Sequence, residues 1–188
     1  KSVRAELIAD VATIGPGATF NLAVRLTMRP GWHVYWINPG DAGLPTVVKI
    51  NAPAGFKVEF MGHPVPVEFD QPGNIVGYGY TDTVMLLAKV TAPKDLPPGT
   101  SVDFSADAKW LVCKDVCLPG KASPVLSLPV AESASPANEA LFHQWQDRLP
   151  APIDQKAAAG VTVEKGVHVI SVQWRQPVTN VQFFASPG

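Results

Sequence analysis

Cys113 and Cys117 are the two cysteines among 188 residues, and their four-position spacing limits the chemistry they can do. If the chain turns between them, the sulfurs can close a small disulfide ring. Such a ring is a weak structural staple, because loop entropy gives it about 2 kcal/mol against more than about 4 kcal/mol for a hundred-residue loop. It does hold both sulfurs together in the oxidised and reduced forms, as dithiol–disulfide exchange requires. The spacing alone therefore leaves a redox-active pair and an inert local disulfide as equal alternatives.

Charged residues near the pair act in opposite directions. Lys109 and Lys114 would favour the thiolate form of the cysteines, whereas Asp107 and Asp115 would oppose it. The sequence therefore leaves open whether the thiols are activated.

Copper binding is a second chemistry for the pair. Two soft sulfurs in a C-x3-C loop suit Cu(I), usually with a remote third ligand. The candidate third ligands are His33, His63, Met61 and Met85. A closed zinc site needs four ligands, and the sequence has no second Cys or His pair at ligand spacing. A Cu(I)-binding module that uses Cys113 and Cys117 therefore remains an alternative to redox exchange.

Two aromatic segments also attract attention. Residues 31–37 hold three aromatic rings and a histidine and precede a turn-rich loop, which predicts a core strand followed by a connection. The functional alternative is that part of the Asn38–Leu44 loop lies against the cysteine pair. Gly77 to Tyr80 has half of a dinucleotide-binding fingerprint without its third glycine, so we expect a turn or aromatic loop there.

The scaffold that must position these residues is predicted to consist of short strands. Phe20, Leu22, Val24 and Leu26 alternate with more polar residues, which is typical of a strand with one buried face. Further strands are expected at 3–11, 46–50, 57–60, 83–90, 101–106 and 124–130. Glycine and proline, 15 and 19 residues, separate these runs as turns. This spacing predicts an all-β fold, an immunoglobulin-like antiparallel β-sandwich over residues 1–130.

The composition changes after residue 130. Residues 131–150 are predicted to form a linker and a helix over 136–149, with Ser135 as the N-cap and Pro136 in the first turn. Leu141, Phe142, Trp145 and Leu149 fall on one helical stripe. Strands expected at 161–163, 167–174 and 180–184 indicate that residues 151–188 are the start of a second β domain, truncated or docked on the first.

The charge balance and the apolar runs argue against nucleic acid as a partner and against a membrane-spanning helix. With 15 Lys and Arg against 16 Asp and Glu, the chain has no basic field for nucleic acid. The longest apolar run, Val84 to Ala88, is far short of the roughly 20 residues of a membrane helix. The chain begins at Lys1 without a leader pattern, so we expect a removed leader or a mature boundary there.

Taken together, two motifs resemble a known family. Trp32 to Pro45 (WHVYWINPGDAGLP) and Trp110 to Pro119 (WLVCKDVCLP) are similar to the periplasmic N-terminal region of the DsbD/ScsB family. The ScsB branch, suppressor of copper sensitivity protein B, is the closer match, and the resemblance covers about residues 3–130. DsbD itself spaces its cysteines more widely.

The resemblance implies a thiol–disulfide oxidoreductase that is the periplasmic part of a membrane-embedded reductase. A thioredoxin-like domain of the same full-length protein would donate electrons. Periplasmic disulfide-containing proteins, of thioredoxin fold or peroxiredoxin-like, would accept them, and no cofactor is needed.

The resemblance also implies roles for individual residues. Cys117 would attack the partner disulfide and Cys113 would resolve the mixed disulfide. A cap within residues 70–80 would shield the pair, with Tyr78 or Tyr80 as the shielding ring. Trp110 and Asp41 would line the site.

Overall fold

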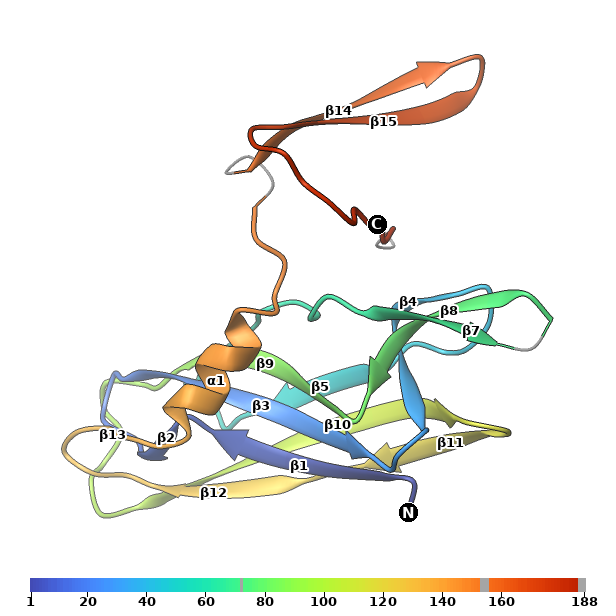
Figure 1. The fold of residues 1–188 in the computed structure, drawn as a ribbon. Coiled ribbons are helices and arrows are strands. Elements are labelled where there is room, and N and C mark those ends of the chain that lie inside the picture. Colours follow the sequence, from blue (N-terminus) through green and yellow to red (C-terminus); the bar gives the residue numbers. More distant parts are fainter. Residues whose placement is uncertain (72, 153–155, 186–188) are drawn as a thin grey trace. The chain divides into compact units, whose positions relative to one another are not determined.

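The computed structural model describes residues 1–71, 73–152 and 156–185 (Figure 1). The chain divides into two compact units, residues 1–149 and 150–186. The first unit carries both cysteines, and each unit is described here by itself.

Two large antiparallel sheets form most of the first unit, as the sequence predicts. One sheet has four strands in the order β1 (Val3–Ala9), β3 (Thr19–Met28), β9 (Thr83–Thr91) and β6 (Lys57–Phe60). The other has the order β11 (Cys117–Ala122), β10 (Ser101–Cys113), β4 (His33–Gly40), β8 (Ile75–Thr81) and β7 (Val67–Gln71). Two more strands of this sheet, β5 (Val47–Asn51) and β12 (Val125–Pro129), pair with β10. The predicted immunoglobulin-like β-sandwich is confirmed.

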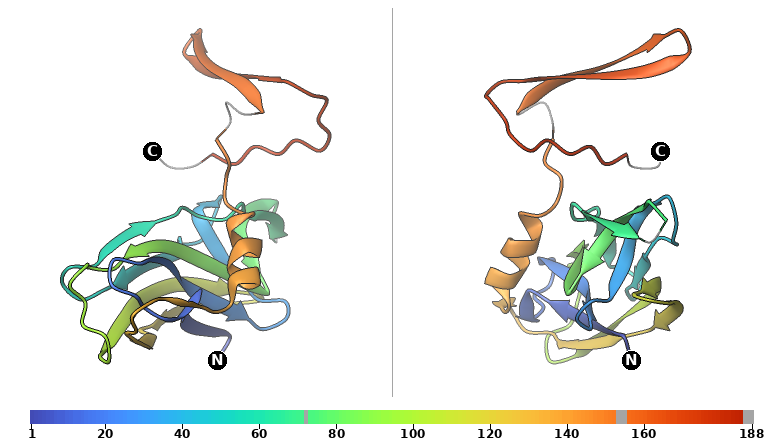
Figure 2. Two further views of the ribbon diagram at one scale, coloured as in Figure 1. Left: turned by 90° about the vertical axis from the view of Figure 1, so that its left-hand side faces the viewer. Right: turned by 45° about the vertical axis from the view of Figure 1, so that its right-hand side comes forward.

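The core lies between the two sheets (Figure 2). The alternation predicted for β3 is confirmed, because Phe20, Leu22, Val24 and Leu26 are each at most 2% exposed. From the other sheet, the Phe104 ring meets Phe20 edge to face with ring centroids 5.9 Å apart. Burial of these side chains supplies the main driving force for the sandwich.

Strand β10 is the backbone of the larger sheet. It pairs with β12 and then β11 along one edge, and with β5 and then β4 along the other. Its even-numbered residues from Val102 to Val112 are buried, and most of its odd-numbered residues face outward. The strand is much longer than the predicted segment 101–106, and it carries the chain directly to Cys113.

The segment around Gly77 and Gly79 corrects the sequence interpretation. It forms strand β8, paired with β7 in a hairpin, and not the expected turn or aromatic loop. A Cβ on Gly77 would come within 2.4 Å of the Phe69 ring, and a Cβ on Gly79 within 2.1 Å of the Val34 carbonyl oxygen. These glycines therefore permit close contact inside a sheet and do not mark a bend.

Helix α1 (Glu139–Gln146) belongs to the first unit and is shorter than predicted. Phe142 and Trp145 of the predicted stripe are buried. Ser135 and Pro136 do not begin the helix; they form the short strand β13 (Ser135–Pro136), which pairs with β2 (Val11–Thr13). That pairing holds the segment in an extended conformation. The helix starts only after Asn138, which has a positive φ of 54° and donates its side-chain amide to the Ala9 carbonyl.

The second unit contains one hairpin, β14 (Ala157–Glu164) and β15 (Val167–Trp174). Residues 180–184, predicted as a strand, are irregular in the described structure. In neither described unit is there a helix with the length and apolar character needed to cross a bilayer.

Replacing Phe104 by Ala is expected to remove about 3–5 kcal/mol of unfolding free energy, because the fully buried ring leaves a cavity among Phe20 and Phe56. Urea denaturation followed by tryptophan fluorescence measures the loss. Phe60→Ala is the control, since Phe60 is 49% exposed and should cost less than about 1 kcal/mol. Equal losses in the two variants would contradict the assignment of Phe104 to the core.

Candidate active site

The two cysteines lie opposite each other at the tip of the β10–β11 hairpin, on either side of the turn that joins the two strands (Figure 1). Their sulfurs form a disulfide, and their Cα atoms are 4.1 Å apart. The connecting loop is short, and the Lys114 amide donates to the Val116 carbonyl over 3.2 Å. The small ring allowed by the spacing is therefore formed, and strand pairing places both sulfurs.

Exposure differs sharply between the two cysteines. Cys113, the last residue of β10, is 1% exposed. Cys117 is exposed, as are the loop residues between them. A macromolecule approaching the hairpin would therefore reach the Cys117 sulfur and not the Cys113 sulfur.

The residue directly across from Cys113 on strand β4 is His33. Side chains of directly paired residues share one face of a sheet, with Cβ atoms about 4.5–5.5 Å apart. His33 in turn contacts two rings on that face: its ring centroid is 5.2 Å from that of Tyr35 and 4.1 Å from that of Phe69. We call His33, Tyr35 and Phe69 the aromatic cluster; it borders the disulfide on the side of Cys113.

Burial makes the aromatic cluster electrically neutral. Desolvation lowers the pKa of His33 below its ordinary value, since the imidazolium form loses hydration. Desolvation also raises the pKa of Tyr35, although a 3.4 Å hydrogen bond from its hydroxyl to the Gln71 Oε1 acts in the opposite direction. The His33 Nε2 lies 3.4 Å from the same hydroxyl. A neutral imidazole, able to accept a proton, therefore stands beside the buried sulfur.

The loop after β4 is fastened to the aromatic cluster. A Cβ on Gly43 would lie 2.5 Å from the Tyr35 ring, so the backbone there rests directly on Tyr35. Asp41 fixes the loop to β8: its amide donates to the Val76 carbonyl, and its carboxylate accepts from the Val76 amide, both over 2.9 Å. The loop thus contacts the neighbours of the cysteines, and Asp41 holds it in position.

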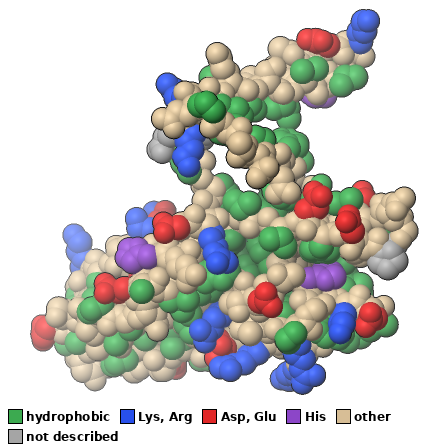
Figure 3. All heavy atoms as spheres, in the orientation of Figure 1, with side chains coloured by type: hydrophobic (Ala, Val, Ile, Leu, Met, Phe, Trp, Pro, Cys, Tyr) green, Lys and Arg blue, Asp and Glu red, His purple; other side chains and the backbone are tan. Residues whose placement is uncertain are grey.

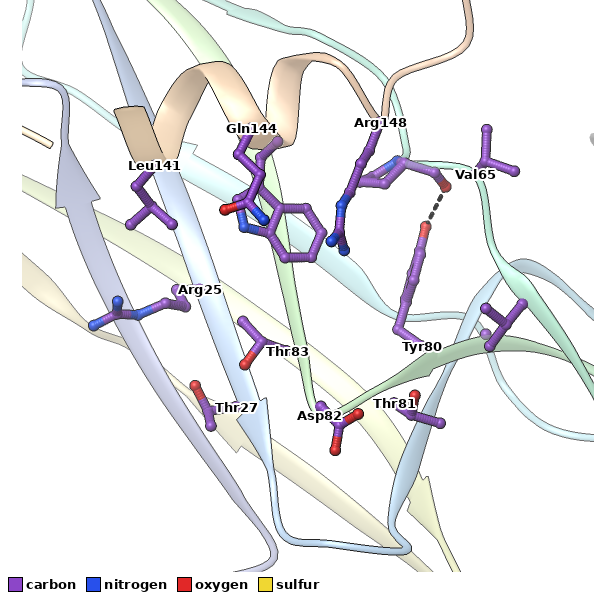
Figure 4. A pocket seen from close by; sticks show the side chains of 14 residues that line it. Arg25, Thr27, Val65, Tyr80, Thr81, Asp82, Thr83, Leu141, Gln144 and Arg148 are labelled. Carbon is purple, nitrogen blue, oxygen red and sulfur yellow. Dashed lines mark hydrogen bonds between the residues drawn. The ribbon is translucent and has the colours of Figure 1, made fainter. Parts of the chain in front are cut away.

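The structure places Tyr78 and Tyr80 away from the disulfide face. Tyr80 pairs with Val34, which pairs with Val112, and this row is buried in the core. The Tyr80 hydroxyl donates to the Pro64 carbonyl over 2.8 Å beside a pocket under helix α1 (Figure 4). Tyr78 alternates with Gly77, whose disulfide-side face is covered by the Phe69 ring.

Phe69 is the aromatic ring that the sequence interpretation missed. It lies one residue before the expected cap range, on β7, and its ring is on the disulfide side of the sheet. The period-2 pattern of Val67, Phe69 and Gln71 is the sequence signal that could have identified it.

Trp110 lies on the core side of β10, near the cysteines in sequence but on the other face of the sheet. It is 8% exposed, and a Cβ on its partner Gly120 would come within 2.3 Å of the indole Nε1. The Trp110 side chain therefore packs against Gly120 of the partner strand, on the core side of the hairpin.

The third copper ligands proposed from the sequence are not gathered around the sulfurs. Met85 is fully buried in β9 of the other sheet, and the His63 ring meets that of Phe60 edge to face, with centroids 5.0 Å apart. His33 is the candidate that lies next to the pair. Within residues 1–71, 73–152 and 156–185, no group of three or more His, Cys, Asp or Glu side chains is arranged to hold a metal ion.

The lowered pKa of His33 predicts that the protein loses stability as the pH falls below about 6.5, the ordinary histidine pKa. In that range the unfolded chain takes up a proton that the folded chain does not, so the free energy of unfolding decreases until the pH reaches the folded pKa. Urea denaturation at several pH values should show this slope, and His33→Phe should reduce it. His63, whose pKa burial also lowers, keeps part of the slope in that variant, and His33→Phe/His63→Phe should flatten it further. An unchanged slope in His33→Phe would show that His33 is already protonated in the folded protein.

Comparisons with known proteins give the family context. The family model for the N-terminal region of the thiol:disulfide interchange protein DsbD matches residues 4–129. The N-terminal periplasmic domain of ScsB from Proteus mirabilis is similar in structure, with a TM-score of 0.63 and 20% identity; the alignment covers 94% of this chain and 66% of that chain. The chain thus spans just under two thirds of that structure, and at this identity the likeness shows a shared fold.

More distant structures were also found. The complex between the DsbD N-terminal and the PilB N-terminal domains from Neisseria meningitidis has a TM-score of 0.32 and 14% identity, covering 63% of this chain and 80% of that chain. The DsbD N-terminal domain of the same organism, in the reduced form, has a TM-score of 0.28 and 14% identity, covering 71% and 90%. No curated protein sequence matches the chain.

The family match covers well over half of the chain and includes both cysteines and the strands that position them. With the Cys113–Cys117 disulfide at its hairpin tip, the protein belongs to the family of DsbD N-terminal domains, which take part in thiol–disulfide exchange.

Proposed function

We propose that this chain is a periplasmic thiol–disulfide exchange domain that passes electrons from a thioredoxin-like domain of its full-length protein to disulfides of periplasmic partner proteins. The observation that carries the proposal is the unequal exposure of the two bonded cysteine residues at the hairpin tip: Cys113 is 1% exposed, whereas Cys117 is exposed. An electron relay needs one sulfur that partner proteins can reach and a second, neighbouring sulfur that resolves the mixed disulfide. The motif similarity to the ScsB branch associates the exchange with copper tolerance.

The exchange proceeds in two substitutions at sulfur. In the reduced domain, the Cys117 thiolate attacks one sulfur of a partner disulfide, forms a mixed disulfide and expels the first partner thiolate. The Cys113 thiolate then attacks the Cys117 sulfur, closes the internal disulfide and expels the second partner thiolate. The partner gains two electrons and the domain loses two. The donor restores the reduced pair by the reverse sequence.

Local groups must activate the thiols, because the cysteines lie in a hairpin and not at a helix N-terminus. His33 is neutral through burial and stands across from Cys113, so it is placed to take the Cys113 proton during the second substitution. Lys114 adjoins Cys113, and its exposed side chain adds positive charge at the tip, which favours thiolates.

Shielding of the buried sulfur is assigned to the aromatic cluster. Cys113 lies on the outward face of its sheet and yet is 1% exposed, so neighbouring side chains must cover it. His33 is its cross-strand neighbour and Phe69 stacks on His33 at 4.1 Å. In an oxidising compartment such a cover limits unproductive reactions until a partner displaces it.

Reaction of the reduced protein with Ellman's disulfide tests the order of attack. Cys113→Ser should keep a stable mixed disulfide between Cys117 and thionitrobenzoate, detected by mass spectrometry, because the resolving sulfur is gone. Wild type should release the dye without retaining the adduct. Cys117→Ser should react at least about tenfold more slowly, since its remaining thiol is buried. A faster reaction of Cys117→Ser than of Cys113→Ser would reverse the proposed roles.

Removal of the Phe69 ring should make the disulfide more reactive toward small reductants. Phe69→Ala is expected to speed reduction by dithiothreitol at least about threefold, as the cover over His33 and Cys113 is lost. Tyr78→Ala is the matched control, because Tyr78 alternates to the other side of the hairpin. If Tyr78→Ala speeds reduction and Phe69→Ala does not, the shielding ring is the one expected from the sequence.

A further inference from the structure

We propose that the outward face of the β10–β11 hairpin is a docking groove for an extended protein segment that carries a carboxylate about 13 Å from its reactive sulfur. The inference rests on the proposed exchange function and specifies the kind of partner that the site accepts. It comes from an unusual pairing of charges four residues along β10 from Cys113.

Lys109 of β10 and Lys121 of β11 are direct cross-strand partners. Both are exposed, and their side chains share one face of the sheet, the face that carries the disulfide. Like charges directly opposite each other destabilise a ladder. The fold therefore carries a local cost here that an incoming negative charge would relieve.

No acidic side chain of the described structure forms an ion pair with either lysine. The ion pairs of the described residues join Arg4 and Arg25 to Glu6, and Lys57 to Glu59. Asp107, two residues before Lys109 on the same face of β10, accepts hydrogen bonds from Asn51 and Ser123, and Lys49 and Lys109 both help to lower the pKa of its carboxyl group. This carboxylate offsets part of the charge of Lys109, so the two lysines together still leave a net positive charge on this face.

A cross-strand pair of apolar residues lies between the lysine pair and the disulfide. Leu111 and Pro119 are cross-strand partners there. A shallow groove of about 450 Å³ lies at this level of the hairpin. Leu44, Pro45, Trp110, Pro119 and Gly120 line it together with Lys109 and Lys121, and Leu44 is 61% exposed. From the disulfide row to the lysine row is about 13 Å along the strand, since each residue of a strand advances about 3.3 Å.

The location suits an extended segment. β11 is the edge strand of its sheet, so one side of the hairpin is open to another chain. Figure 3 shows Lys and Arg side chains gathered along the lower edge of the first unit, where β1 and β11 lie in Figure 1. The whole chain has a net charge of −1, so attraction for an acidic segment must come from this edge and not from the total charge.

The groove therefore selects a partner whose attacked cysteine is followed or preceded by apolar residues, with Asp or Glu about four positions away. The partner sulfur would sit at Cys117, its apolar residues on Leu111 and Pro119, and its carboxylate between the two lysines. Docking would precede the sulfur substitution and leave its chemistry unchanged.

The test uses short peptides as activated mixed disulfides with thionitrobenzoate. One pair of peptides places Glu four residues after or before the cysteine, and a second pair has Gln at the same position. With the reduced 188-residue protein, the Glu peptide of at least one pair should react at least about threefold faster than its Gln counterpart at low salt, and the difference should vanish at high salt. Lys121→Glu should invert the preference.

Lys94→Glu is the matched control, because it makes the same change in net charge in the exposed β9–β10 loop, at the opposite end of β10 from Cys113. It should keep the wild-type preference. A preference that Lys121→Glu leaves intact, or that Lys94→Glu also abolishes, would overturn the docking groove. Bis(2-hydroxyethyl) disulfide separates this failure from a failure of the exchange function, since wild type with an active pair reduces this neutral probe whether or not the peptides show a charge preference.

Discussion

The structure depends on the pairing of β10 along both of its edges. This strand meets β12 and β11 on one side and β5 and β4 on the other, so its path and its pleat are fixed over 13 residues. Because successive residues of a strand face opposite sides, Val112 closes the core and Cys113 turns outward. The last core residue of β10 and the first cysteine of the disulfide are therefore neighbours, and the ladder sets the position of the sulfur.

This origin distinguishes the site from one built at a helix terminus. A strand end supplies no aligned peptide dipole, so thiolate stabilisation has to come from nearby cations, exposure and proton acceptors. The sandwich provides these separately: an exposed cysteine at the hairpin tip, a buried one behind it and a neutral imidazole across the ladder. The two cysteines differ in exposure because the β10–β11 ladder ends at this pair.

Local patterns predicted the elements but not their long-range neighbours. The alternation from Phe20 to Leu26 identified β3, and segment 57–60 matches β6, because such patterns report burial within one strand. The β7–β8 hairpin was missed, because a glycine in a sequence can indicate either a turn or a strand position with no room for a side chain. Gly77 and Gly79 are of the second kind. The spacing of the two cysteines allowed the small disulfide ring, and the resemblance of the two motifs to a known family indicated its redox role. His33 and Phe69 join it only through the registers of β4 with β10 and of β7 with β8, which no local pattern contains.

The same registers hold the alignment of the β10–β11 hairpin independently of the disulfide. A slip of one residue would move Cys117 to the core face, so the hairpin must hold its alignment in the reduced form. The indole of Trp110 lies across Gly120, where any other residue would clash, and this contact fixes the alignment without the sulfur bond. A ring closed over so few residues adds little chain-entropy stabilisation. The strand ladder therefore holds the alignment of β10 with β11, and this alignment does not depend on the disulfide.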